Sequence, residues 1–419
     1  MAEKSLVTNL TYVATSETVQ ALVRRTHEQR VLAVLRERGA LSRAQIGERV
    51  GLSRTTLSEI TADLIARGAV VVARTDLEQR TGSGRPAELL ALDPGAGQYV
   101  GIDLGHSRVR VVIADAAHEI VASGVQEYDA SLTWPQRQDA GFDLLDRLAT
   151  ERGLHFGALQ GIAVGVAGPD ASIRQQVRAS LAERFACQVI VDNNTRFAAL
   201  AEAMAENTEN TEKTTSAEDL GDLLYIRLSE GIGGGLVIGG RLVPGGRGAA
   251  GEFGHVRVVK DGATCRCGKR GCLETVASVG ALLAEARRRG VDLPDAAALG
   301  DALAAGDNTV RATVDRAADL LARVLADAAL MLSPARVVIG GTLPTLAPYI
   351  VDTVAAIVGA ELEAVDSGPP LVRAARLGDE DGARGAIAAL YHQSPLLAEY
   401  DLAVPAAPTP HPQTWRARA

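Results

Sequence analysis

Apolar residues near the start of the chain recur at the spacing of an α-helix. In residues 27–38 (HEQRVLAVLRER), four apolar residues between Val31 and Leu35 share one side, which predicts an amphipathic helix that Gly39 can end. Residues 1–22 show no clear period, so we expect them to form a flexible arm. The folded part of the chain is therefore expected to begin near residue 23.

Two further helices follow, and each has a recognisable start. Ser42 and Gln45 form a capping box, in which each side chain satisfies a free backbone N–H group, so a second helix starts at Ser42. Gly51 breaks this helix, and Ser53 caps a third helix that runs to about Arg67.

Two short runs typical of β-strands come next, at 70–73 (VVVA) and 88–92 (ELLAL), and the segment RTDLEQRTGSGRP lies between them. Three helices followed by a β-hairpin with a long basic tip resemble a winged helix-turn-helix, which we place at residues 23–92. The segment DPGAG at 93–97 is expected to be a linker.

The third helix is the expected recognition helix, since the N-terminal part of such a helix meets base edges in the major groove. Arg54 can pair with a guanine, and the neighbouring hydroxyl groups can contact bases or phosphates. The Gly-Arg-Pro segment around Arg85 resembles the core of AT-hook arms and suits the narrow minor groove of A·T-rich DNA. The alternative is a surface helix and a flexible loop with solvated arginines. The expected DNA contacts are Ser53, Arg54, Thr55, Thr56, Ser58, Arg80 and Arg85.

The distribution of charge agrees with a DNA-binding head. The 419-residue chain has a net charge of −8, but residues 1–92 carry 13 Lys and Arg against 10 Asp and Glu. A basic head on an acidic body favours contact with nucleic acid, although an excess this small also arises by chance. No apolar run approaches the roughly 18 residues of a membrane helix, and the N-terminus lacks the apolar stretch of a secretory signal. We therefore expect a cytoplasmic protein.

From residue 98 the pattern changes to alternating strands and helices, which predicts an α/β fold. A strand–turn–strand unit at 99–114 returns in weaker form at 223–240, as if two similar lobes were joined. The polar segment 206–219 is expected to be a mobile loop. The expected divisions are 98–215 for the first lobe, 216–393 for the second lobe and 394–419 for a disordered tail.

A cluster of metal-binding residue types lies in the second lobe. His255 precedes Cys265 by ten positions, and Cys267 and Cys272 follow within eight residues. One histidine and three thiolates supply the four ligands of a closed tetrahedral zinc site, which predicts structural Zn²⁺ with no open position for catalysis. The alternative is three free thiols beside an unrelated histidine.

The same segment resembles the signature of the ROK family, GEhGH followed by CxCGxxGCxE, from Gly251 to Glu274. The resemblance covers roughly residues 27–395. It implies a two-lobed actin-like ATPase fold with a ligand cleft between the lobes, and a C-terminal helix that returns to the first lobe. ROK proteins with an N-terminal winged helix-turn-helix are transcriptional repressors, commonly of sugar-utilisation genes, whereas other members are sugar kinases.

The residues of the cleft depart from those of the ROK kinases. Alignment on the segment AALAE places Asn193 on the family's asparagine and Asn194 on its catalytic aspartate, and an amide cannot act as that base. His106 adds bulk in the first phosphate loop, and Glu230 puts a negative charge where the second loop would meet phosphate. We therefore expect no kinase activity.

The residues that the resemblance assigns to sugar binding mostly remain, since carboxylates and amides suit vicinal hydroxyl groups. Alternatively, these residues only support the zinc site. After residue 170 the chain turns at once into a helix-like segment, where the family has a longer loop that forms part of the cleft wall. The expected ligand-binding residues are Asn193, Asn194, Glu252, His255 and Glu274.

Together these features predict a transcriptional regulator, most simply a repressor of carbohydrate-utilisation genes. It would bind an inverted-repeat operator in double-stranded DNA, with A·T-rich flanks, as a homodimer or a tetramer. A small carbohydrate in the cleft would modulate operator affinity. Two alternatives stay open: a ligand-independent regulator with a vestigial cleft, and an active sugar kinase with an added DNA-binding head.

Overall fold

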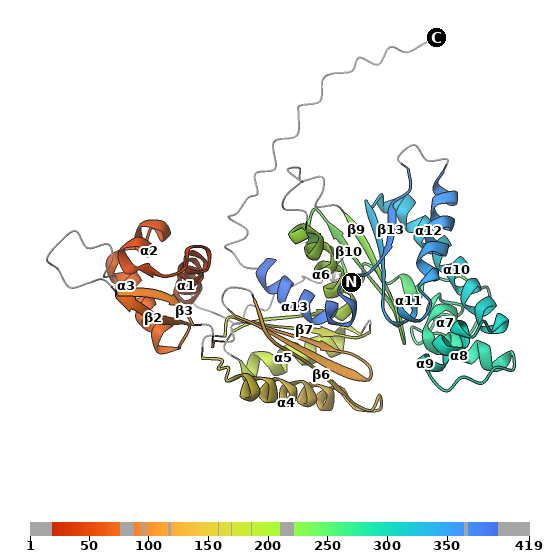
Figure 1. Cartoon of the computed structure of the whole chain (residues 1–419), viewed down its shortest axis with the longest axis horizontal. Coiled ribbons are helices and arrows are strands. Elements are labelled where there is room, and N and C mark those ends of the chain that lie inside the picture. The colour runs from red at the N-terminus through yellow and green to blue at the C-terminus, as the bar shows by residue number, and fades with distance from the viewer. Residues whose placement is uncertain are drawn as a thin grey trace, which may run out of the picture. The chain divides into compact units, whose positions relative to one another are not determined.

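The computed structural model contains two compact units, Met1–Ala96 and Gly97–Ala419 (Figure 1). The division falls inside the segment expected to be a linker. The structure describes residues 19–75, 88–93, 95–96, 99–115, 119–157, 159–168, 170–185, 187–209, 222–363 and 368–392. The tail from residue 394 and the tip of the predicted hairpin, which carries Arg80 and Arg85, lie outside these ranges.

The first unit is a winged helix-turn-helix, as the sequence predicts. A three-stranded sheet in the order β1-β3-β2 packs beside three helices. The first helix begins at Val19 rather than at residue 27, so residues 19–22, expected in the arm, are helical. The elements are α1 (Val19–Arg38), β1 (Leu41–Ser42), α2 (Arg43–Val50), α3 (Arg54–Ala66), β2 (Val70–Thr75) and β3 (Glu88–Leu92).

Local signals set the helix boundaries in this unit. The hydroxyl of Ser42 accepts a hydrogen bond from the backbone N–H of Gln45, and the Gln45 side chain bonds the Ser42 backbone in return. Gly51 ends α2 with a φ of 68°, in the left-handed region that glycine adopts without strain. Leu57, Ile60 and Leu64 of α3 are buried, and this apolar stripe holds the helix in the core.

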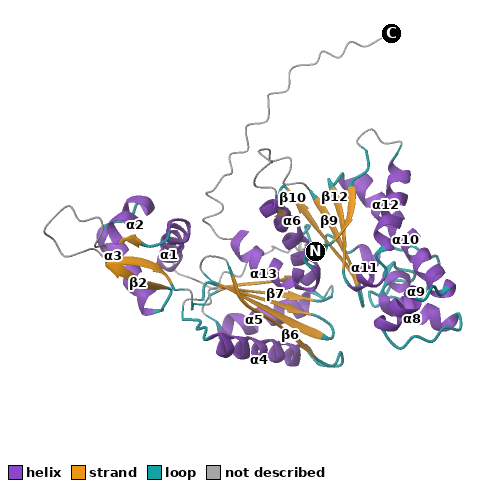
Figure 2. Ribbon diagram, viewed as in Figure 1, coloured by secondary structure: helices purple, strands orange, loops and turns teal. Residues whose placement is uncertain are grey.

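The second unit contains two five-stranded sheets of the same design (Figure 2). In each sheet, antiparallel strands occupy one side and parallel strands the other. This repetition confirms the prediction of two similar lobes. The first sheet, in the order β6-β5-β4-β7-β8, contains β4 (Tyr99–Leu104), β5 (Arg108–Ala114), β6 (Ile120–Glu127), β7 (Gly161–Val166) and β8 (Gln188–Asn193). The second, in the order β11-β10-β9-β12-β13, contains β9 (Leu223–Leu228), β10 (Ile232–Ile238), β11 (Arg241–Leu242), β12 (Arg336–Gly340) and β13 (Leu371–Ala374).

Helices cover both sheets. The first sheet packs on α4 (Trp134–Arg152) and α5 (Ala171–Arg184) with one face, and on α6 (Asn194–Glu209) and α13 (Asp381–His392) with the other. Helix α6 also packs against β9 and β10, so it links the two sheets. It continues to Glu209, so the start of the segment 206–219 is helical rather than a loop, and residues 210–221 lie outside the described ranges.

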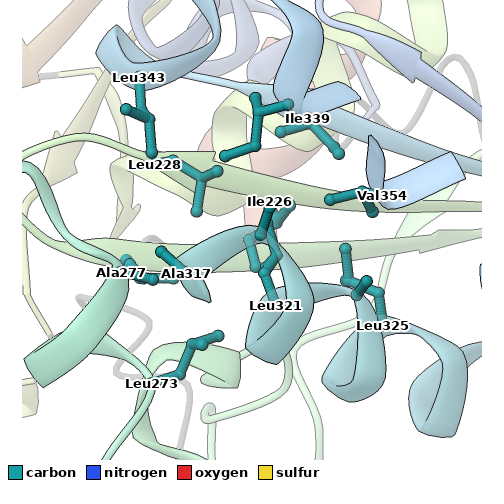
Figure 3. Packing of buried hydrophobic residues seen from close by; sticks show 14 of the residues in the cluster. Ile226, Leu228, Leu273, Ala277, Ala317, Leu321, Leu325, Ile339, Leu343 and Val354 are labelled. Carbon is teal, nitrogen blue, oxygen red and sulfur yellow. The ribbon is translucent and has the colours of Figure 1, made fainter. Parts of the chain in front are cut away.

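The largest core lies on the outer face of the second sheet. Ile226, Leu228 and Ile339 of the sheet belong to one buried cluster with Leu321 and Leu325 of the long helix α10 (Figure 3). Burial of this apolar surface is the main stabilising contribution in the lobe. The other helices here are α7 (Glu274–Ala277), α8 (Val279–Arg288), α9 (Ala296–Ala304), α10 (Asn308–Leu332), α11 (Thr342–Leu346) and α12 (Tyr349–Leu362), with 3₁₀ turns at Phe253–His255 and Gly378–Glu380.

Candidate functional site

The first turn of α3 exposes the residues expected to contact DNA. Arg54, Thr55 and Ser58 are exposed on the helix surface. The hydroxyls of Ser53 and Thr56 lie 2.9 Å apart, and the Ser53 oxygen accepts the backbone N–H of Thr56. These two side chains therefore cap the helix, while Arg54, Thr55 and Ser58 face outward.

A set of ion pairs that the sequence analysis missed holds α3 against α1. Glu28 of α1 is buried and lies 2.6 Å from the Arg67 guanidinium, just after α3. Arg24 contacts Glu28 and, at 3.3 Å, Asp63 of α3. Because the pairs join the two helices, they fix the position of α3 within its unit. No local pattern in the sequence marks residues 39 positions apart as partners.

A cavity of about 610 Å³ lies between the two sheets of the second unit. It is lined by the turns after β4 and β9, the start of α6, the segment around Glu252 and the start of α13. Four of the five expected ligand-binding residues line it: Asn193, Asn194, Glu252 and His255. Glu274 is not among the lining residues. Helix α5 begins at Ala171, so the helix-like segment expected after residue 170 is confirmed.

The two asparagines of the cavity already have protein partners. The Asn193 side chain accepts the backbone N–H of Thr195 at 2.8 Å and donates to the carbonyl of Gly168 at 3.2 Å. The Asn194 amide donates to an Asp103 carboxylate oxygen at 2.8 Å. The structure thus uses Asn193 to shape the turn into α6 and Asn194 to hold Asp103.

A buried ionic network crosses the cavity floor. Arg227 of β9 forms an ion pair with Asp381 of α13 and lies 3.7 Å from Asp103 of β4. Tyr225 donates its hydroxyl to Asp381. Burial raises the pKa of Asp103, although the neighbouring Arg227 guanidinium opposes this shift. The sequence analysis did not single out Arg227, but a charged residue within the apolar strand LLYIRL was a usable signal.

The turn after β4 is fixed by two side chains. The Gly105 carbonyl accepts the Tyr128 hydroxyl at 2.8 Å and an Arg137 guanidinium N–H at 3.2 Å. Arg137 is buried and stacks over the Trp134 ring, with 4.7 Å to its centroid. Burial, assisted by nearby arginines, lowers the pKa of His106 in this turn. Both effects favour the neutral form of this imidazole.

His255, Cys265, Cys267 and Cys272 come together as the spacing predicts, with their ligand atoms within 4.8 Å of one another. The Cys265 sulfur lies 3.4 Å from His255 Nδ1, and the Cys267 and Cys272 sulfurs lie 3.7 Å apart. A tetrahedral zinc ion with ordinary bond lengths separates two sulfurs by about 3.8 Å, and a sulfur from a nitrogen by about 3.6 Å. These two pairs match the expected separations, and all four ligand atoms lie close enough together to hold one metal ion.

Glu274 is buried beside this cluster. Its Oε2 accepts the backbone N–H of Ile232 at 3.0 Å and the Arg266 guanidinium at 2.7 Å. Arg266 also lies 3.4 Å from His106 Nε2 in the first lobe. Arg266 lines the cavity, whereas Glu274 does not.

Among the described residues, every helix is too short or too polar to cross a membrane. Two family models match the chain: the ROK family over residues 99–394, and a winged helix-turn-helix DNA-binding model over residues 24–71. The chain belongs to the ROK family. The family and fold expected from the sequence are thereby confirmed.

This ROK protein is similar to named regulators. The xylose repressor of Bacillus subtilis (strain 168) is 26% identical over 277 residues, covering 63% of this chain and 68% of that protein. The DNA-binding transcriptional dual regulator NagC of Escherichia coli (strain K12) is 26% identical over 378 residues, covering 84% of this chain and 89% of NagC.

Solved structures agree on the fold. A ROK family transcriptional regulator, described as a homologue of the E. coli MLC protein, matches 90% of this chain and 98% of its own, with a TM-score of 0.61 at 19% identity. The ROK hexokinase from Thermus thermophilus is 30% identical and matches 69% of this chain and 97% of its own, with a TM-score of 0.56. ROK kinases and ROK regulators thus share the architecture of the second unit.

Proposed function

We propose that this ROK protein is a transcriptional repressor that binds operator DNA and releases it when a small carbohydrate enters the cleft. The proposal rests mainly on the exposed first turn of α3 in the winged helix-turn-helix, where Arg54, Thr55 and Ser58 face outward. One relative named as a repressor and one named as a transcriptional dual regulator, aligned with 63% and 84% of this chain, support the proposal. A further relative, the N-acetylglucosamine repressor of Escherichia coli O157:H7, is 26% identical over 378 residues. Its name and that of the xylose repressor make N-acetylglucosamine and xylose the first sugars to test.

DNA recognition is assigned to the first turn of α3 and to the wing. Arg54 would read a guanine, while Ser53, Thr55, Thr56 and Ser58 would contact bases or phosphates. Arg80 and Arg85, in the tip of the predicted hairpin, would enter an A·T-rich minor groove. A homodimer, or a tetramer, would place two heads on an inverted repeat.

The carbohydrate would bind in the 610 Å³ cavity. Asn193, Asn194, Glu252 and His255 line it, and Glu274 lies directly behind Arg266. Carboxylates and amides recognise neighbouring hydroxyl groups through paired hydrogen bonds.

Zinc is the metal that suits the cluster, because three thiolates and an imidazole match its ligand preference. His255, Cys265, Cys267 and Cys272 would hold it, and a bound ion would stabilise the loop that carries Arg266. With four protein ligands the role is structural.

The cleft is not equipped for phosphoryl transfer. Asn194 cannot take a proton from a sugar hydroxyl, and Asp103 is already engaged by Asn194 and Arg227. Glu230 lies exposed in the turn after β9 and repels a phosphate there. These departures support a regulator without kinase activity.

A ligand-independent regulator is the second candidate, because the side chains of Asn193 and Glu274 are already hydrogen-bonded within the protein. The deciding experiment is fluorescence anisotropy with the DNA upstream of the protein's own gene, at physiological salt and with non-specific competitor. Competitor-resistant binding that D-xylose or N-acetylglucosamine reverses supports the sugar-responsive repressor. Specific binding that no sugar reverses favours the second candidate, and binding no tighter than to competitor contradicts a role at this operator.

A further inference from the structure

One exposed arginine connects the loop of the metal cluster to the opposite lobe. We propose that Arg266 couples sugar binding to the arrangement of the two lobes: it ties Glu274 to His106 in the DNA-binding form, and the sugar's hydroxyl groups displace it. This inference rests on the proposed function, because it assigns a residue to the response of the same cleft.

The two contacts of Arg266 lie on different lobes. One guanidinium nitrogen donates to Glu274 Oε2 at 2.7 Å, within the second lobe. The other lies 3.4 Å from His106 Nε2, in the turn after β4 of the first lobe. Because this turn is held by Tyr128 and Arg137, a contact with His106 reaches a fixed part of the first lobe. Arg266 is therefore positioned as a tie between the lobes.

The structure leaves room for this guanidinium at one particular residue. Gly231, in the turn after β9, has no side chain, and a Cβ placed there would meet the Arg266 Nη2 atom at 2.7 Å and Glu274 Oε2 at 3.0 Å. A larger residue at this position would require the Arg266 guanidinium to shift. Gly231 therefore allows the three segments that carry Gly231, Arg266 and Glu274 to approach one another closely.

A sugar and Arg266 compete for one carboxylate. Glu274 Oε2 already has two donors, and Oε1 faces the Cys265 sulfur at 3.8 Å. Arg266 lines the cavity in front of Glu274, so a sugar hydroxyl reaches that carboxylate only after Arg266 leaves. The Arg266 side chain is 43% exposed and can swing into solvent without breaking buried packing. Its departure also breaks the contact with His106.

The test uses the full-length, zinc-loaded protein and two alanine variants in the same loop. Arg266→Ala removes the tie. Arg270→Ala is the matched control, because Arg270 is also exposed but donates to Gly262 within its own loop. Zinc content is measured for every preparation, so that a damaged loop is recognised. His106→Ala breaks the same tie from the first lobe, away from the metal cluster, and serves if Arg266→Ala loses zinc.

Two readouts are compared. Operator affinity is measured by anisotropy without sugar, and sugar affinity is measured by calorimetry with D-xylose and N-acetylglucosamine in the absence of DNA. Loss of one charge-assisted hydrogen bond corresponds to about a tenfold change. We expect Arg266→Ala and His106→Ala to bind the operator about tenfold more weakly than the parent protein. Arg270→Ala should bind the operator and the sugar with the affinities of the parent. Arg266→Ala should bind the sugar about tenfold more tightly.

The sign of the sugar effect separates this role from that of an ordinary ligand-binding residue, whose removal weakens sugar binding. Operator affinity unchanged in Arg266→Ala, or weaker sugar binding in that variant, overturns the inference while the proposed function stands. If neither sugar binds the parent protein, displacement of Arg266 by these two sugars is contradicted. The operator affinities of the variants then test the tie between the lobes by itself. If the parent protein does not bind the operator specifically, the proposed function fails and the inference fails with it.

Discussion

Replacing Arg54 by alanine should separate DNA recognition from folding. Arg54 is the first residue of α3, and within the part of the chain that the structure describes its guanidinium makes no hydrogen bond or ion pair. The cap is made by Ser53 and stays in place in the variant. A positive charge at a helix N-terminus opposes the helix dipole, so its removal should leave stability unchanged or raise it by about 0.3–1 kcal/mol.

The expected loss in operator binding is much larger. A bidentate arginine–guanine pair contributes about 1–3 kcal/mol of discrimination, which corresponds to a loss of about 5- to 150-fold in operator affinity. Binding to non-specific DNA depends on phosphate contacts and should fall by a much smaller factor. Anisotropy at fixed salt measures both affinities, and thermal unfolding measures stability.

Arg323→Ala is the matched control for Arg54→Ala. Arg323 is an exposed helical arginine on α10 that pairs with Asp319, so its loss changes the net charge by the same amount. Operator affinity should stay within about twofold of the parent in this control, because Arg323 lies on α10, outside the winged helix-turn-helix. Stability should also change little, because exposed ion pairs of this kind contribute about 0–1 kcal/mol. An Arg54→Ala variant with parental operator affinity, or with equal losses on operator and non-specific DNA, would refute the assignment of Arg54 to base recognition.

Three further predictions concern the second unit. Cys265→Ser should remove one equivalent of zinc and lower the melting temperature, because metal binding contributes to folding; elemental analysis that finds no zinc in the purified parent protein contradicts this. The parent protein should show no sugar-dependent ATP turnover in a coupled ADP assay, and Asn194→Asp should not create it, since Asp103 stays paired with Arg227; turnover in either protein refutes the reasoning. Asp381→Asn should lower the free energy of unfolding, measured by urea titration, by about 3 kcal/mol, because the buried Arg227 charge then has only Asp103 as a counter-charge. A loss below about 1 kcal/mol would contradict this and mean that solvent reaches the ion pair of Arg227 and Asp381.

The features that sequence analysis predicted well are local. The capping box at Ser42 and the cap at Ser53 each involve residues three positions apart, so a few neighbouring residues are enough to predict where each helix starts. The cluster of one histidine and three cysteines was predictable because three of its four members lie within eight residues. The two strand–turn–strand units were visible because each pairs neighbouring strands through a short turn.

Contacts between distant segments could not be predicted in the same way. Arg227 and Asp381 are 154 residues apart, and only the placement of β9 beside α13 makes them partners. Glu274 illustrates the same limit. Its position in the family signature suggests that it binds a sugar, but in the structure its carboxylate accepts a hydrogen bond from Arg266. That contact depends on how the loop that carries Arg266 packs against Gly231. Residue type and spacing therefore predicted which residues lie at the candidate site. The hydrogen-bond and ion-pair partners of those residues depended on the tertiary fold.

The hydrogen bond from Asn194 to Asp103 gives a physical reason for an asparagine rather than an aspartate at position 194. An aspartate at position 194 would bring a second carboxylate to the position of an amide that now lies 2.8 Å from Asp103. Burial already raises the pKa of Asp103, and a like charge at this distance would force one of the two groups to hold a proton. The asparagine instead donates a hydrogen bond and leaves the single Asp103 charge to Arg227. Because Arg227 also pairs with Asp381, the amide at position 194 is a better partner for Asp103 than a second carboxylate would be.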